Sequence, residues 1–126
     1  MQQPRQVGVV SAAVIKTLGE RACHYQAGDA IYIGERNLSH IKSQHFLTYQ
    51  KYHDKLPIVI SEPDYVGINE DDGSLEYIKI FDEHIKLAIR IAGDDKLYIR
   101  TMYTVHESRT DYFIKSGMLK PLTKEM

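Results

Sequence analysis

Residues 75–105 read LEYIKIFDEHIKLAIRIAGDDKLYIRTMYTV, and their apolar pattern decides the fold. In Ile85–Ile91 every second residue is a large apolar one, which is typical of a β-strand with one face on the core. Leu75–Phe81 and Leu97–Val105 read as further strands, separated from it by short acidic or glycine-containing turns. Because such short connections join antiparallel neighbours, the stretch predicts three antiparallel strands.

The sheet is expected to extend on both sides of this stretch. Asp64–Ile68 precedes the turn sequence Asn69–Gly73 and reads as a strand, and Asp111–Lys115 reads as a last edge strand. The second half of the chain therefore predicts an antiparallel sheet of four to five strands.

The first half is predicted to be mainly helical. After a short strand at Ala30–Ile33, Gly34 precedes the polar stretch Glu35–Asp54, which has good helical composition. One stripe at a spacing of three to four residues is formed by Leu38, Ile41, His45, Tyr49 and Tyr52. It fits one helix or two helices bent near Phe46, whereas Val7–Leu18 fits a strand or a short helix. The fold class is α+β, with an N-terminal helical part packed on a C-terminal sheet.

Length and composition predict one soluble domain spanning residues 1–126. A chain of 126 residues can bury a stable hydrophobic core without disulfides or other cross-links. With Cys23 as its single cysteine it can form no internal disulfide, which fits a reducing compartment. The apolar run Val7–Ile15 is too short to span a bilayer and lacks a basic leader. We therefore expect a cytoplasmic protein without a membrane anchor.

The net charge of −1 argues against an indiscriminate nucleic-acid binder. The charges are unevenly distributed, since residues 1–55 hold seven Lys and Arg against four Asp and Glu, and residues 56–126 hold nine against thirteen. A local basic site is compatible with this distribution if the acids of the second half face elsewhere.

Strand alternation predicts which side chains share the outer face of the sheet. If Ile78 and Ile80 point inward, that face carries Lys79, Lys86, Arg90, Arg100, Tyr77, Tyr98, His84 and His106. Cations interleaved with aromatic rings are typical of RNA-binding surfaces, where they meet phosphates and stack on bases. A solvated antiparallel face of this composition is the alternative.

The segment His40–His45 is the strongest candidate for chemistry, because imidazole exchanges a proton near neutral pH and Lys42 lies beside it. His45 lies on the apolar stripe and His40 does not, and a hydrogen-bonded core histidine is the alternative for His45. Metal binding is disfavoured, since the two histidines are five residues apart and no HExxH pattern or cysteine helper accompanies them. No nucleophile elbow, P-loop or dinucleotide fingerprint is present, so we expect no cofactor.

Several segments together resemble one family. They are Ile31–Gly34, Leu38–His45, Ile58–Ile60 with Pro63–Asp64, Leu75–Lys79 and Tyr98–Tyr103. In this order they resemble the phage-borne branch of the Barnase-EndoU-colicin-RelE (BECR) superfamily of nucleases. The resemblance covers about residues 28–106 and leaves the first 27 residues unassigned.

The resemblance implies metal-independent cleavage of RNA, often of tRNA, by a toxin or mobile-element protein with catalytic groups on both helix and sheet. Carried over by position, these groups are His40, His45, Lys79 and Thr101. The substrate-binding residues are expected from the predicted outer face of the sheet, and they are Lys86, Arg90, Arg100, Tyr77 and Tyr98. A toxin of this kind has an immunity or antitoxin protein as its partner. Alternation groups Thr101 with the core residues Leu97 and Ile99, so either it lines the cleft between helix and sheet or the predicted faces are wrong.

The hypothesised reaction is attack of the RNA 2′-hydroxyl on its own phosphorus, giving a 2′,3′-cyclic phosphate. The alternative from the sequence is a non-catalytic domain of the same fold that holds RNA or a protein partner, as a phage regulatory or anti-defence protein would.

Overall fold

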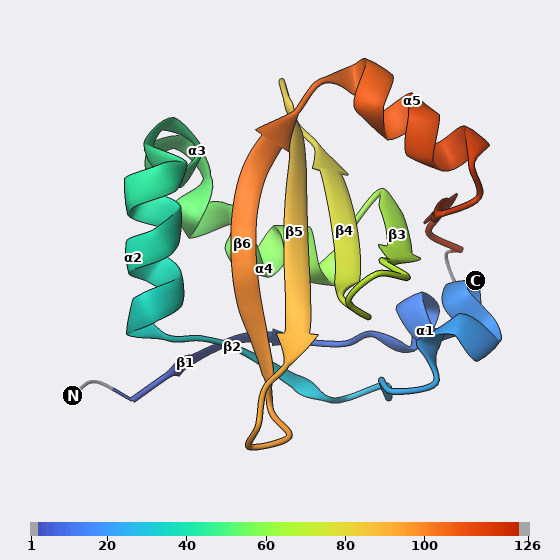
Figure 1. Cartoon of the computed structure of the whole chain (residues 1–126), viewed down its shortest axis with the longest axis horizontal. Helices are drawn as coiled ribbons and strands as arrows, with labels where there is room; N and C mark the ends of the chain where they lie inside the picture. The colour runs from blue at the N-terminus through green and yellow to red at the C-terminus, as the bar shows by residue number, and fades with distance from the viewer. Residues whose placement is uncertain (1–2, 124–126) are drawn as a thin grey trace.

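The computed structural model of the chain describes residues 3–123, which form helices around one β-sheet (Figure 1). The strands are β1 (Arg5–Val9), β2 (Ala30–Ile33), β3 (Tyr65–Ile68), β4 (Leu75–Ile80), β5 (His84–Ile91), β6 (Leu97–Val105) and β7 (Leu119–Pro121). The α-helices are α1 (Ala12–Leu18), α2 (Glu35–Gln44), α3 (Phe46–Tyr52), α4 (Leu56–Ser61) and α5 (Glu107–Lys115). Two short 3-10 helices are η1 (Gly19–Ala22) and η2 (His53–Lys55).

The sheet is mixed and larger than predicted. Its seven strands follow the order β1-β2-β6-β5-β4-β3-β7, and the neighbours are antiparallel except for the parallel pair of β2 and β6. The α+β class is confirmed, but the prediction of a four- to five-stranded antiparallel sheet is wrong. The additional strands at one edge come from the N-terminal part, which is therefore not wholly helical: β1 pairs with β2, and β2 adds to the free edge of β6.

Two further segments can be compared with the secondary structure predicted from the sequence. Asp111–Lys115 is part of helix α5 and not an edge strand, because His106 caps this helix by accepting from the Ser108 amide and Thr110 is buried on its inner side. The C-terminal edge strand is β7 instead, which pairs with β3. The ambiguous stretch Val7–Leu18 contains both a strand and a helix, β1 and α1.

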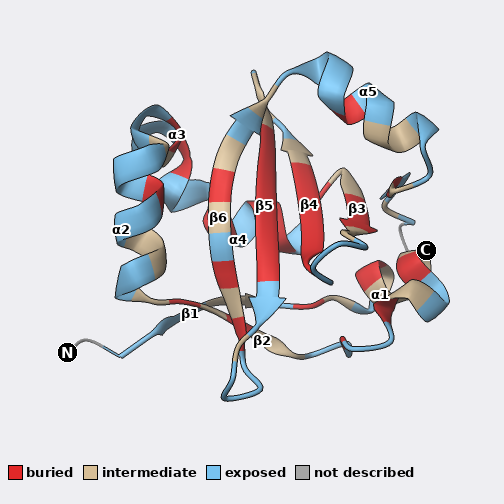
Figure 2. Ribbon diagram, in the orientation of Figure 1, coloured by how far each residue is buried: buried red, intermediate tan, exposed pale blue. Residues whose placement is uncertain are grey.

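One face of the sheet is packed against α1 and α4, and α4 passes behind the central strands in Figure 1. The core on this side combines sheet residues Leu75, Tyr77, Ile85, Leu87, Ile89 and Ile99 with helix residues Val14, Leu18, Val59 and Ile60. Burial is continuous along the middle of β5 and β4 (Figure 2). Removal of this apolar surface from water is the main source of stability for such a layer arrangement.

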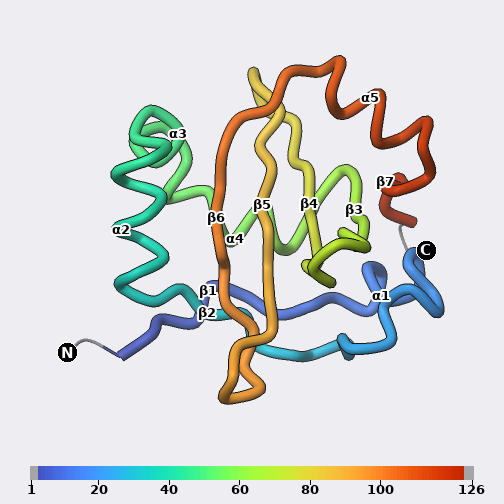
Figure 3. Tube along the Cα trace, viewed as in Figure 1, coloured from blue at the N-terminus to red at the C-terminus, as the bar shows by residue number. Residues whose placement is uncertain are grey.

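The N-terminal and C-terminal parts meet beside the sheet. In Figure 3 the chain after α5 returns next to α1. There the Thr123 amide donates to the Thr17 hydroxyl at 2.9 Å, and Arg21 donates to the carbonyls of Gly117 and Met118 at 3.0 Å each. These bonds fix the end of α5 and the following segment against the body of the fold.

The predicted faces of β4 and β6 need correction. In β6 the register shifts between the Ala88–Thr101 pair and the Ile89–Ile99 pair, so Arg100 is the extra residue of a β-bulge. Beyond the bulge the alternation changes phase, and Thr101 faces outward on the side opposite the core.

In β4 the predicted phase is reversed along the whole strand. Glu76 lies opposite Ala88, and Ile78 opposite Lys86, on the outer face. Tyr77 and Lys79 therefore face the core side, and Tyr77 is 0% exposed.

Candidate active site

The outer face of the sheet is open between two helical walls. Helices α2 and α3 lie beside β6, and α5 lies on the other side, beyond β4 (Figure 1). Buried Ile41 anchors α2 in the core. The helix ends at His45, whose φ of −138° and ψ of 52° are not helical, and whose carbonyl accepts from Tyr49 in α3. Of the two alternatives for this stretch, two helices bent near Phe46 are observed, and the bend places His45 at the junction of the two helices.

Two histidines and a tyrosine form a contiguous ring cluster at this junction. The His45 ring stacks on Tyr103 of β6 with centroids 5.2 Å apart, and His40 meets His45 edge to face at 5.9 Å. His40 is exposed and His45 is half-buried. The cluster therefore presents two imidazoles to one part of the outer face, with the orientation of His45 fixed by a sheet residue.

The environment of His45 changes its protonation. Burial lowers the pKa of the His45 imidazole below its ordinary value of 6.5, and the electrostatic interaction with the nearby His40 ring lowers it further. At neutral pH the His45 ring is consequently neutral and able to accept a proton.

This effect of His40 on His45 can be measured. We expect the His45 imidazole to titrate below pH 6.5 in a histidine NMR titration, and in His40→Gln we expect its pKa to rise but to stay below that value, because burial remains. An unchanged His45 pKa in the variant would show that the two rings do not interact in solution.

The ring cluster borders a cleft of about 400 Å³ on the outer face. Its lining consists of His40, His45, Asn69, Asp72, Ser74, Glu76, Lys86, Ala88, Arg100, Thr101 and Tyr103. These residues come from α2, the β3–β4 turn and the three central strands. The cleft therefore lies between helix and sheet.

A buried ion pair lies in the floor of the cleft. Lys86 Nζ is 2.9 Å from Glu76 Oε1, with the two side chains 11% and 4% exposed, and Asn69 donates to the other Glu76 oxygen at 3.3 Å. The ammonium also lies 5.7 Å from the centroid of the Tyr103 ring and 5.2 Å from that of Phe113. Burial, the largest influence, lowers the pKa of Lys86, but Glu76 and Tyr103 together raise it above its ordinary value. Lys86 is thus a fixed cation.

Two further polar groups line the cleft. Arg100 is directed to Asp72, with Nη1 2.7 Å from a carboxylate oxygen. The Thr101 hydroxyl is buried and has no hydrogen-bond partner within residues 3–123. A buried hydroxyl without a partner is unfavourable, and an oxygen of a bound anion could accept a hydrogen bond from it.

Comparison with known proteins identifies the family. Residues 5–112 match the sequence model of the family described as phage-Barnase-EndoU-ColicinE5/D-RelE like nuclease 3. The chain belongs to this family. The resemblance predicted from the sequence is confirmed, and the match also includes most of the N-terminal residues that the resemblance had left unassigned. The comparisons with curated proteins and with solved structures each found no match.

The structure brings some of the site residues predicted from the sequence together and separates others. His40, His45, Lys86, Arg100 and Thr101 share the cleft.

Four other proposed residues do not line the cleft. Lys79 lies on the core side, where its ammonium donates to the Glu62 carbonyl at 2.7 Å. Tyr77 is in the core, Arg90 is exposed at the far end of β5, and the Tyr98 hydroxyl donates to Asp94 at 2.9 Å.

The sequence interpretation missed Glu76, Asp72, Asn69 and Tyr103 as lining residues of the cleft. The signal for Glu76 was an acid between two apolar strand positions, Leu75 and Tyr77. A carboxylate at such a position is unfavourable unless a cation is nearby.

Among residues 3–123 no group of three or more His, Cys, Asp or Glu side chains is arranged to hold a metal ion. In the same part of the chain no helix has the length and apolarity needed to cross a bilayer.

Proposed function

We propose that this nuclease-family chain is a metal-independent endoribonuclease that cleaves by 2′-hydroxyl transesterification. The observation that carries the proposal is the His40–His45 pair at 5.9 Å, beside two cations and an unpaired hydroxyl in one cleft. The reaction needs no metal-bound water, since the nucleophile is already held within the substrate.

His45 is the general base in this proposal. Its lowered pKa favours the neutral ring, which accepts the 2′-hydroxyl proton as the oxygen attacks the adjacent phosphorus. Stacking on Tyr103 holds the ring in place, so little rotational freedom is lost when substrate binds. His40, the second imidazole of the pair, then protonates the departing 5′-oxygen.

The charge that develops on the phosphorane oxygens is stabilised from the sheet. Lys86 has three N–H donors, and those not directed to Glu76 are available for a phosphate oxygen. Arg100 turns from Asp72 to the phosphate when substrate enters, and the Thr101 hydroxyl donates to it. The role that the resemblance gave to Lys79 passes to Lys86.

Cleavage products provide the test of this mechanism. We expect the purified chain to cleave an RNA pool containing tRNA in the presence of EDTA, leaving 2′,3′-cyclic phosphate and 5′-hydroxyl ends. The measurement is end-group analysis of the fragments, with a DNA strand of the same sequence as the control that must stay intact. Strict dependence on Mg²⁺ or Mn²⁺, or fragments with 5′-phosphate ends, would contradict transesterification.

A further inference from the structure

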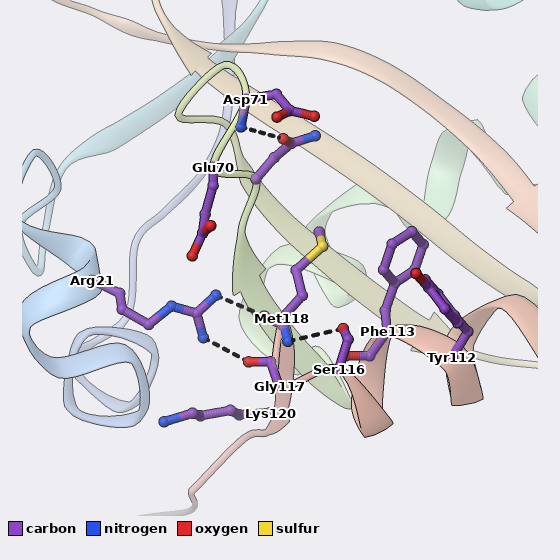
Figure 4. A pocket seen from close by; sticks show the side chains of 10 residues that line it. Arg21, Glu70, Asp71, Tyr112, Phe113, Ser116, Gly117, Met118 and Lys120 are labelled. Atoms are coloured by element: carbon purple, nitrogen blue, oxygen red, sulfur yellow. Dashed lines mark hydrogen bonds between the residues drawn. The ribbon is translucent and has the colours of Figure 1, made fainter.

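A second hollow of about 550 Å³, drawn in Figure 4, shares the lining residue Asn69 with the cleft of the candidate active site. Tyr112 and Phe113 of α5 form one wall, Arg21 and Lys120 lie opposite, and Glu70 points into it from the β3–β4 turn. We call it the Tyr112 pocket. The family match ends at residue 112, so Phe113, Lys120 and the Ser116–Met118 part of the lining lie outside the matched region.

The Tyr112 pocket adjoins the cleft. Asn69 lines both hollows, and its side chain bonds Glu76 in the cleft and the Asp71 amide beside the pocket. Phe113 lines the pocket while its ring faces Lys86 of the cleft at 5.2 Å. An RNA strand with a phosphate at Lys86 would therefore bring a neighbouring nucleotide toward the pocket.

The charges of the pocket suit a base better than a second phosphate. Arg21 is already engaged, since its guanidinium donates to the carbonyls of Gly117, Met118 and Ile68. Lys120 and Arg21 are balanced by the carboxylates of Glu70 and Asp71, so the lining has no net positive charge to hold a phosphate, whereas an ionised carboxylate accepts hydrogen bonds from the N–H groups of a base edge.

The aromatic wall supplies the stacking surface. Tyr112 is 63% exposed, an unusual fraction for a ring of this size, and Phe113 braces it edge to face with centroids 5.3 Å apart. Phe113 is itself held between Lys86 and Arg109, which lies 5.1 Å from its ring centroid. The exposed Tyr112 ring is thus supported from behind and presents a face to solvent.

We propose that the Tyr112 pocket binds one unpaired nucleobase next to the cleaved phosphate, stacked on Tyr112 with its N–H groups toward Glu70. This inference rests on the proposed function for its ligand, an RNA strand. The pocket makes the enzyme select single-stranded RNA at this position, because a base in a duplex cannot leave its stack without an energetic cost.

Binding without cleavage tests the inference. A fluorescent 2′-fluoro oligonucleotide lacks the nucleophile, and a matched strand with abasic residues keeps the phosphates but not the bases. We expect Tyr112→Ala to weaken binding of the base-carrying strand about tenfold, the scale of one lost stacking contact. Binding of the abasic strand should not change, and Tyr112→Phe should bind both strands like the wild type, because it keeps the ring.

Leu47→Ala is the matched control, because Leu47 is a 69% exposed apolar side chain on α3, across the sheet from α5. Three outcomes would contradict base binding in the pocket. Tyr112→Ala could weaken the binding of both strands equally, it could leave their binding unchanged, or the wild-type protein could fail to bind the base-carrying strand. Cleavage is scored separately. If the protein binds the oligonucleotide through Tyr112 but does not cleave RNA, only the proposed function is refuted. If it cleaves RNA but its binding does not depend on Tyr112, only the proposed base-binding pocket is refuted.

Discussion

His45→Gln is expected to lose at least about 10²-fold in cleavage rate while keeping the fold, because it removes the group that accepts the 2′-hydroxyl proton. Glutamine approximates the size of the imidazole and can pack on Tyr103 at the half-buried α2–α3 junction. The measurement is single-turnover cleavage of a defined RNA, together with the thermal unfolding midpoint of the variant.

His53→Gln is a closely matched control. His53 also stacks on a tyrosine, with its ring centroid 4.7 Å from that of Tyr49, but it lies outside the cleft. We expect this variant to cleave at the wild-type rate. A His45→Gln protein that unfolds at a clearly lower temperature but cleaves normally would make His45 a structural residue.

The rate should also depend on pH through the same group. Since the pKa of His45 is lowered, the acidic limb of kcat/KM should have its midpoint below pH 6.5, with activity lost as the pH falls and the ring gains a proton. This limb should disappear from the residual activity of His45→Gln.

Strand alternation predicted the sheet well where the strands are regular. In β5 the apolar positions Ile85, Leu87 and Ile89 are buried on the core side, as the pattern indicated. The pattern failed at Thr101 because the β-bulge at Arg100 adds one residue, and a bulge leaves no clear mark in a run of alternating residue types.

The predicted phase of β4 was wrong for a different reason. Tyr77 and Ile78 are both large and apolar, so either phase of Leu75–Ile80 gives an acceptable apolar face. Tertiary structure selects the phase in which Tyr77 enters the core, while Ile78 is buried on the opposite face. Lys79 can point to the core side because the residue lies near the edge of the core, where its ammonium reaches the Glu62 carbonyl.

The candidate site was accessible to sequence reasoning only in part. The helical stripe placed His45 toward the sheet, and the imidazole pair follows from the bend between α2 and α3. The pairing of Glu76 with Lys86 could not be predicted, because it depends on the register that sets Ile78 opposite Lys86 and makes Glu76 a diagonal neighbour.

That buried pair yields the prediction with the largest effect on stability. Lys86→Met should lower the free energy of unfolding by about 3–5 kcal/mol, because it leaves the Glu76 carboxylate buried without its cation. The measurement is urea unfolding, with midpoint and slope compared to the wild type. Lys51→Met is the control, since the Lys51–Glu83 pair is exposed and its loss should cost less than about 1 kcal/mol.

A double variant separates the structural role of Lys86 from its proposed catalytic one. In Glu76→Gln/Lys86→Met the buried charge is gone and the glutamine carbonyl can still accept from Asn69, so most of the lost stability should return. Cleavage should stay reduced by about 10²- to 10³-fold, because the cation that contacts the phosphorane oxygens is still missing. If cleavage recovered together with stability, Lys86 would serve only to neutralise Glu76, and Arg100 and Thr101 would be left to stabilise the transition state.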